Sequence, residues 1–110
     1  MEAYADLGEM YRKGQGVPKD YEYAKELFRQ PAEQGVTNAQ IGLGQMYKQG
    51  QGVDQDDILA YKWFHLAKGN GADGEASAQK ELEKLEEEMT SQEIGEAKEL
   101  AREWRKKHGE

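Results

Sequence analysis

The 110-residue sequence has no cysteine, only two prolines and few large apolar residues. Without cysteine, it has no disulfide bonds, thiol nucleophiles or thiolate metal ligands. Leu, Ile, Val and Phe together number 16, below the fraction of roughly 20% at which highly charged chains are typically disordered. No stretch approaches the roughly 18 apolar residues of a membrane span, and the N-terminus does not resemble a secretory signal. We expect a soluble protein, cytoplasmic or exported with its signal removed.

Basic residues are also fewer than acidic ones. The sequence has 15 Lys and Arg and 22 Asp and Glu, which gives a net charge of −7. Residues 73–100 carry 3 basic and 10 acidic side chains, whereas residues 101–110 carry 4 and 2. A protein that binds duplex nucleic acid normally needs a basic stripe to neutralise phosphates. The charge distribution therefore argues against a nucleic-acid partner, and the acidic run at 86–88 is interpreted as a solvated helix face.

What the sequence does contain is an internal repeat. Shifting the chain by 36 residues places residues 3–35 on 39–71 with 13 identities in 33 positions. Most of the identical residues are glycines or apolar residues, the types that turns and packing constrain. A fixed period of this length is typical of stacked helical repeats, in which each unit has too little apolar surface to fold alone.

Each unit is predicted to form two helices. Apolar residues of the first helix follow the spacing i, i+4, i+7, i+8, and this helix should end at Gly14 or Gly50 in a left-handed cap. The second helix should begin after Asp20 or Asp56, which are good N-cap residues. Gly8 and Gly44 interrupt the first helices, and we interpret them as contact points with the second helix. A capping box is expected to open the next helix at residues 37–40.

Residues after 73 follow a different pattern. Ala78, Leu82, Leu85 and Met89 form one apolar stripe, and a capping box at residues 90–93 opens a last helix that ends in basic residues. The prediction is an all-α single domain over residues 1–110, an α/α solenoid of antiparallel helix hairpins with about six helices. Repeat 1 covers about 3–38, repeat 2 about 39–74 and the capping helices about 75–108.

The motif Leu-Gly-x-Met-Tyr-x-x-Gly-x-Gly-Val-x-x-Asp occurs at residues 7–20 and again at 43–56, and Ala-Tyr-Lys-Trp-Phe follows at 60–64. These segments resemble the Sel1-like repeat family, which is related to the tetratricopeptide repeats. A plain tetratricopeptide array is the alternative, but its 34-residue period and shorter turn fit less well. The resemblance implies a protein-binding adaptor or scaffold, often in bacterial signalling or envelope-associated assemblies.

The sequence departs from the family pattern in two ways. Pro31 stands where an alanine is usual, so we expect the second helix to kink or end near Gln30, because proline lacks a backbone donor and clashes with the preceding turn. The array is also short, and nothing precedes Ala3 to cover the first helix pair. This uncovered face predicts a homodimer.

No residue pattern points to catalysis, a cofactor or a metal. The Gly-x-Gly pairs at 14/16 and 50/52 lack the strand and the Gly-Lys-Ser/Thr of a phosphate loop, so we interpret them as caps and turns. His65 has no partner at metal-ligand spacing and is expected to be a partly exposed structural residue, while His108 is placed in a frayed tail. The recurring aromatic residues are assigned to packing between helices, and one or two of Tyr4, Tyr21, Tyr23 and Tyr61 are expected to be exposed.

The candidate protein-binding surface is the concave face, which the first helix of each repeat should line. The side chains there that lie away from the packing positions are Glu9, Arg12, Lys13, Asn38, Gln45, Lys48 and Gln49. These positions differ between the repeats while the packing positions do not. Such variation is expected of a binding groove, and equally of any unconstrained surface.

The sequence thus predicts a non-catalytic scaffold that binds a protein or peptide. One alternative is a hydrolase or a cell-wall or small-molecule-binding role, as suggested for some cysteine-rich relatives, although this chain has no cysteine. The other is a purely structural repeat fragment without a partner.

Overall fold

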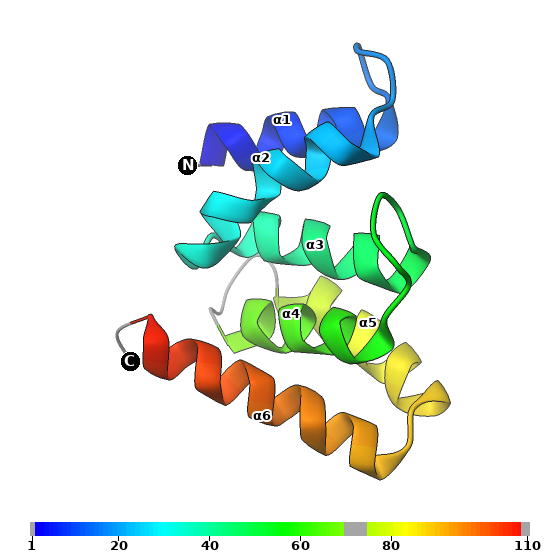
Figure 1. Cartoon of the computed structure of the whole chain (residues 1–110), viewed down its shortest axis with the longest axis vertical. Coiled ribbons are helices and arrows are strands. Elements are labelled where there is room, and N and C mark those ends of the chain that lie inside the picture. The colour runs from blue at the N-terminus through cyan, green and yellow to red at the C-terminus, as the bar shows by residue number, and fades with distance from the viewer. Residues whose placement is uncertain (1, 70–74, 109–110) are drawn as a thin grey trace.

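The chain folds into a stack of helices. A computed structural model describes residues 2–69 and 75–108, and within these ranges it contains six helices and no strand. The helices are α1 (Glu2–Lys13), α2 (Tyr21–Glu33), α3 (Thr37–Gln49), α4 (Asp57–Gly69), α5 (Glu75–Glu88) and α6 (Ser91–Lys107). Helices α1 and α2 pair, as do α3 and α4, and α3 packs against the first pair (Figure 1). The prediction of an all-α solenoid is confirmed.

The linkers inside the two repeats have the same conformation. Gly14 and Gly50 lie in the left-handed region with φ of 72° and 69°, and each donates its N–H to a carbonyl of the preceding turn. A residue with a Cβ is strained in this conformation, which explains the recurrence of glycine. Asp20 and Asp56 then accept the backbone N–H of the residue three positions ahead at 3.1 Å, as expected of N-caps. The Gly-x-Gly segments are therefore turns and caps.

Of the kink or end of α2 that we predicted near Gln30, the end is wrong, whereas the kink stays a prediction. The helix continues through Pro31 to Glu33. Proline lacks the N–H that would bond the carbonyl one turn earlier, so Pro31 costs the helix one intrahelical hydrogen bond. Its ring is fully buried, and its carbonyl accepts the N–H groups of Gln34 and Val36, so packing and the turn offset the lost bond.

The predicted capping box at the start of α3 is also wrong. The N-cap is Val36, one residue earlier, and no side chain caps this helix. Gln40 does not reach back to the helix start but is fully buried, and its Nε2 donates to the carbonyl of Ala32 at 3.2 Å. A buried amide needs such a partner, so Gln40 ties the end of α2 to the next repeat.

Packing between the helices centres on aromatic rings that lie against glycines. The ring of Phe28 is 1% exposed, and an added Cβ at Gly8 of α1 would lie 2.9 Å from it. Phe64 has the same relation to Gly44, where a Cβ would lie 2.8 Å from the ring. The interpretation of these glycines as contact points is confirmed. A further glycine, Gly42, meets Phe28 from the next repeat, and its packing role was not recognised in the sequence.

We expect Gly42→Ala to lower the free energy of unfolding by about 1–2 kcal/mol. The new Cβ would lie 2.5 Å from Phe28 Cζ, and overpacking of this kind outweighs the roughly 1 kcal/mol that alanine gains in a helix. The matched control is Gly95→Ala in α6, where nothing lies within 4 Å and a gain of about 0.5–1 kcal/mol is expected. Urea denaturation followed by circular dichroism measures both, and equal effects at the two sites would contradict the packing role of Gly42.

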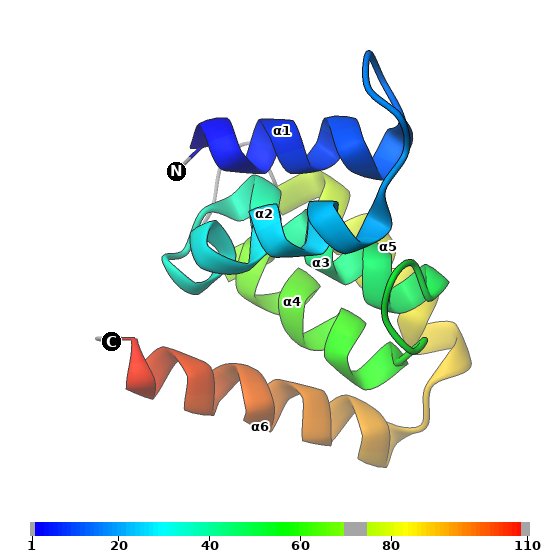
Figure 2. The same cartoon turned by 45° about the horizontal axis from the view of Figure 1, so that its top comes forward.

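The last two helices cover α4 from two directions. Leu82 and Leu85 of α5, with Met89 immediately after it, form a buried cluster with α4, and Ala97 and Ala101 of α6 are also buried, as the predicted stripes require. Helix α6 begins with the predicted capping box, since Thr90 and Glu93 exchange hydrogen bonds. It packs along α4 and lies at the end of the stack (Figure 2).

The first repeat is less well covered than the second. Ala39, Leu43 and Met46 of α3 are all buried, because α2 packs on them, whereas Met10 in the equivalent position of α1 is 37% exposed. Ala3 is exposed and Leu7 is half-buried. Tyr4 and Tyr23 are the exposed tyrosines. The homodimer remains a prediction. None of the helices in the described ranges is both long and apolar enough to cross a membrane.

Candidate functional site

The first helices of successive units line one groove. Its volume is about 390 Å³, and it receives side chains from α1, α3 and α5. Five of the seven predicted binding residues line it, namely Glu9, Arg12, Lys13, Asn38 and Gln45. The other lining residues are Ala5, Asp6, Ile41, Gly42, Ser77, Lys80 and Glu81. Lys48 and Gln49 lie outside the lining but contact it, since Lys48 pairs with Glu81 and Gln49 Nε2 donates to Gln45 at 3.1 Å.

On the α1 side, Glu9 is held by two cations. Arg12 makes two parallel hydrogen bonds to its carboxylate, from Nε at 2.8 Å and Nη2 at 2.9 Å, and Lys13 lies 3.2 Å away. The remaining Arg12 nitrogen donates to Gln51 at 3.3 Å. Burial alone would raise the pKa of Glu9, but the bonds and charges of Arg12 and Lys13 outweigh it and lower that pKa. The bidentate geometry fixes both side chains on one turn of α1.

On the α5 side, Glu81 makes similar contacts, and here most of its partners lie on another helix. Lys48 Nζ lies 2.6 Å from its carboxylate and Gln45 Nε2 donates to it at 3.2 Å, both from α3, while Lys84 is 3.9 Å away. Burial raises the pKa of Glu81, but the hydrogen bonds from Lys48 and Gln45 and the nearby positive charges lower it more. Glu81 therefore fixes the position of α5 relative to α3.

The α5 residues of the groove were not recognised in the sequence, although a signal was present. Moving Glu9 by one period gives Gln45, and a second period gives Glu81. The same two steps relate Arg12 to Lys48 and Lys84. The three helices thus place equivalent positions side by side. Few α5 residues are identical to their counterparts in α3, so the repeat is recognisable in the sequence only up to about residue 71.

We expect Glu81→Gln to lower the free energy of unfolding by about 1 kcal/mol at pH 7, since it removes a largely buried charged hydrogen bond. Because the pKa of Glu81 is lower in the folded chain than in the unfolded chain, its stabilisation is present above the usual glutamate range, near pH 4, and is lost as the pH falls through the folded value. The difference between the variant and the original chain should therefore shrink when urea denaturation is repeated at pH 3.

The control for this prediction is Glu99→Gln, in an exposed pair with Arg102 on α6. Its effect should stay within about 0.5 kcal/mol at both pH values. A Glu81→Gln penalty that is the same at pH 7 and pH 3 would show that the charge of Glu81 is not what stabilises the chain.

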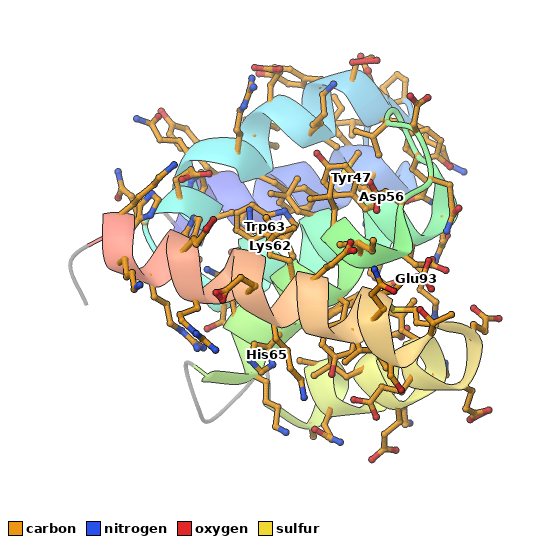
Figure 3. All side chains as sticks on the ribbon, turned by 60° about the horizontal axis from the view of Figure 1, so that its bottom comes forward. Tyr47, Asp56, Lys62, Trp63, His65 and Glu93 are labelled. Atoms are coloured by element: carbon orange, nitrogen blue, oxygen red, sulfur yellow. The ribbon has the colours of Figure 1, made fainter. Side chains whose placement is uncertain are left out.

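The two histidines lie away from the groove. His65 on α4 is half-buried beside Tyr61, with ring centroids 6.1 Å apart and nearly parallel planes. Its pKa is lowered by burial and by the positive charges of Arg105, Lys98 and Lys68. Figure 3 shows His65, Lys62 and Trp63 on α4 beside α6. Across residues 2–69 and 75–108, no three His, Asp or Glu side chains gather where they could hold a metal ion.

The placement of His108 in a frayed tail is wrong. Its ring stacks on Trp104, with centroids 4.1 Å apart, and its Nε2 lies 2.7 Å from the carboxylate of Glu33. Trp104 Nε1 donates to the same carboxylate at 3.2 Å. These contacts join the end of α6 to the end of α2, which the local sequence cannot indicate because the partners are 71 and 75 residues apart.

Stacked antiparallel helix pairs with a groove across their first helices define an α-solenoid repeat protein. The chain belongs to the Sel1 repeat family, whose repeat matches residues 2–36 and 37–71. Repeats of this kind generally mediate protein–protein interactions and are typical of scaffolds without enzymatic activity.

A crystal structure with a similar fold is that of a protective antigen present in uropathogenic Escherichia coli strains, which displays an SLR fold. The TM-score is 0.86 at 32% sequence identity, and the match covers 96% of this chain and 22% of the antigen chain. The chain therefore spans about a fifth of the length of that antigen. No curated protein sequence matches the chain.

Proposed function

We propose that this chain is a non-catalytic scaffold that binds a segment of a partner protein in the groove across α1, α3 and α5. The observation that carries the proposal is the lining itself. Equivalent positions of α1, α3 and α5, the first helices of successive units, line one groove of about 390 Å³. Glu9, Gln45 and Glu81 occupy the same position in these three helices. A partner segment that crosses the three helices would contact different side chains on each of them.

The groove is also suited to binding at low cost in conformational entropy. Arg12 is 11% exposed and fixed by its two bonds to Glu9, and the Lys48–Glu81 pair joins α3 to α5. Side chains held in place before binding lose little freedom when a partner arrives, which increases the affinity obtained from a given set of contacts. This supports a preformed surface in which the backbone moves little on binding.

The test is partner capture by chemical crosslinking with a variant in which Glu9, Arg12, Gln45 and Lys48 are changed to alanine. We expect the captured partner band to be lost. The control changes Glu96, Lys98, Glu99 and Arg102, which are exposed residues of α6, to alanine. It removes two bases, as the groove variant does, and two acids, where the groove variant removes one acid and the amide of Gln45. Circular dichroism of both variants verifies that they are folded.

The proposal fails if the groove variant is folded and captures the same partner as the original chain. It also fails if the α6 control loses the partner while the groove variant keeps it, because the binding face would then be the opposite one. Capture of a small molecule or a cell-wall fragment in place of a protein would favour the alternative function for the same groove.

A further inference from the structure

The groove contains charges that no side chain in the described part of the chain neutralises. Glu9 and Glu81 are bound by cations of the chain, as described above. By contrast, Asp6 on α1 and Lys80 on α5 make no hydrogen bond or ion pair within the described part of the chain, and both are exposed. The same is true of Asn38 in the first turn of α3. These three groups are free to bind a ligand without breaking an existing contact.

The two free charges have opposite signs and lie on opposite sides of the groove. The lining includes Asp6 from α1 and Lys80 from α5. Helix α3 lies between these two helices (Figure 1). The apolar lining residues are Ala5 and Ile41, beside Gly42. The free Asn38 adds an amide, which both donates and accepts hydrogen bonds, as a peptide backbone requires.

From this arrangement we infer that the groove selects a peptide segment with charges of both signs, with a basic side chain facing Asp6 and an acidic side chain facing Lys80. This inference rests on the proposed function of the groove and adds the chemistry of the partner. A segment with basic residues alone would place a like charge against Lys80, and a segment with acidic residues alone would do so against Asp6. Like charges that meet across an interface are strongly unfavourable, so the pair fixes the direction of the bound segment.

The net charge of the chain has a separate effect. At −7, the chain attracts basic segments and repels acidic ones over long distances, which changes association rates but not the direction of binding. A partner chosen by net charge alone would be uniformly basic. The acidic residue that faces Lys80 therefore distinguishes the expected partner from one chosen by net charge alone.

The experiment is selection of peptides from a random displayed library on the full chain, followed by affinity measurement of one selected peptide by fluorescence anisotropy. We expect selected peptides to share one basic and one acidic residue at a constant spacing. Asp6→Lys and Lys80→Asp should each weaken binding about tenfold, because each replaces an attraction by a repulsion. The double variant keeps the net charge, and it should bind the peptide with its two charges exchanged about as tightly as the original pair binds.

The matched control exchanges two charges on α6, Lys98→Glu with Glu99→Lys, and should leave the affinity unchanged. If peptides bind, and binding is lost in the Glu9, Arg12, Gln45 and Lys48 variant but does not respond to Asp6 or Lys80, this inference is overturned while the proposed function stands. Selection of uniformly basic peptides, or failure of the exchanged peptide to restore binding, also overturns it. If no selected peptide depends on the groove, the proposed function fails as well.

Discussion

Phe28→Ala is expected to lower the free energy of unfolding by about 3–5 kcal/mol, as is usual when a fully buried phenylalanine is truncated. The ring is 1% exposed and lies between Gly8 of its own repeat and Gly42 of the next. Neither glycine has a side chain that could fill the space left by the ring. A domain of this size typically has only about 5–15 kcal/mol of stability, so much of it would be lost.

Urea denaturation followed by circular dichroism measures this loss, and Tyr23→Ala is the control. Tyr23 lies on the same helix and also makes an aromatic contact, with the ring of Tyr11 at 4.7 Å, but it is 45% exposed. We expect the Tyr23 variant to lose less than about 1.5 kcal/mol, within the range of an aromatic pair. A similar loss in the two variants would mean that the exposed contact of Tyr23 stabilises the chain as much as the buried ring of Phe28 does.

The second large effect is expected when the chain is cut after residue 74, which removes α5 and α6. Helix α4 would then expose Tyr61, Trp63 and Phe64, which are at most 6% exposed in the full chain. These rings form clusters with Leu82 and Leu85 of α5 and with α6. Because repeat proteins depend on the interfaces between units, the shortened chain should lose its cooperative unfolding transition and bind hydrophobic dyes.

Thermal unfolding and the spread of amide proton NMR signals measure this loss. The control is a chain that ends at Lys107, the last residue of α6, which should keep its cooperative transition. A chain that ends at residue 74 and still shows dispersed signals and a sharp transition would demonstrate that the two repeats are stable without the capping helices.

The repeat, the helices and most of their boundaries were predictable from the sequence because they depend on local chemistry. Gly14 and Gly50 adopt a left-handed conformation that favours glycine in any context, and Asp20 and Asp56 cap helices through bonds to residues three positions away. The low content of large apolar residues, which alone suggested disorder, is partly compensated by packing the rings of Phe28 and Phe64 against glycines of α1 and α3.

The parts that could not be predicted depend on contacts with residues outside the local motif. Pro31 continues a helix because the core covers its ring, and Gln40 leaves a capping pattern because a buried carbonyl of α2 lies within its reach. Neither the core around Pro31 nor the carbonyl that Gln40 binds can be deduced from the adjacent residues in the sequence.

The same distinction applies to the candidate site. The sequence by itself determined that Glu9, Arg12 and Gln45 lie on the first helices, because helical periodicity separates them from the packing residues. Only the tertiary structure decided that α5 completes the groove, that Glu81 pairs with Lys48, and that Asp6 and Lys80 have no partner among residues 2–69 and 75–108. The physical reason is that ion pairing depends on distances across the stack, and these are set by how rings and glycines pack between helices rather than by any local pattern.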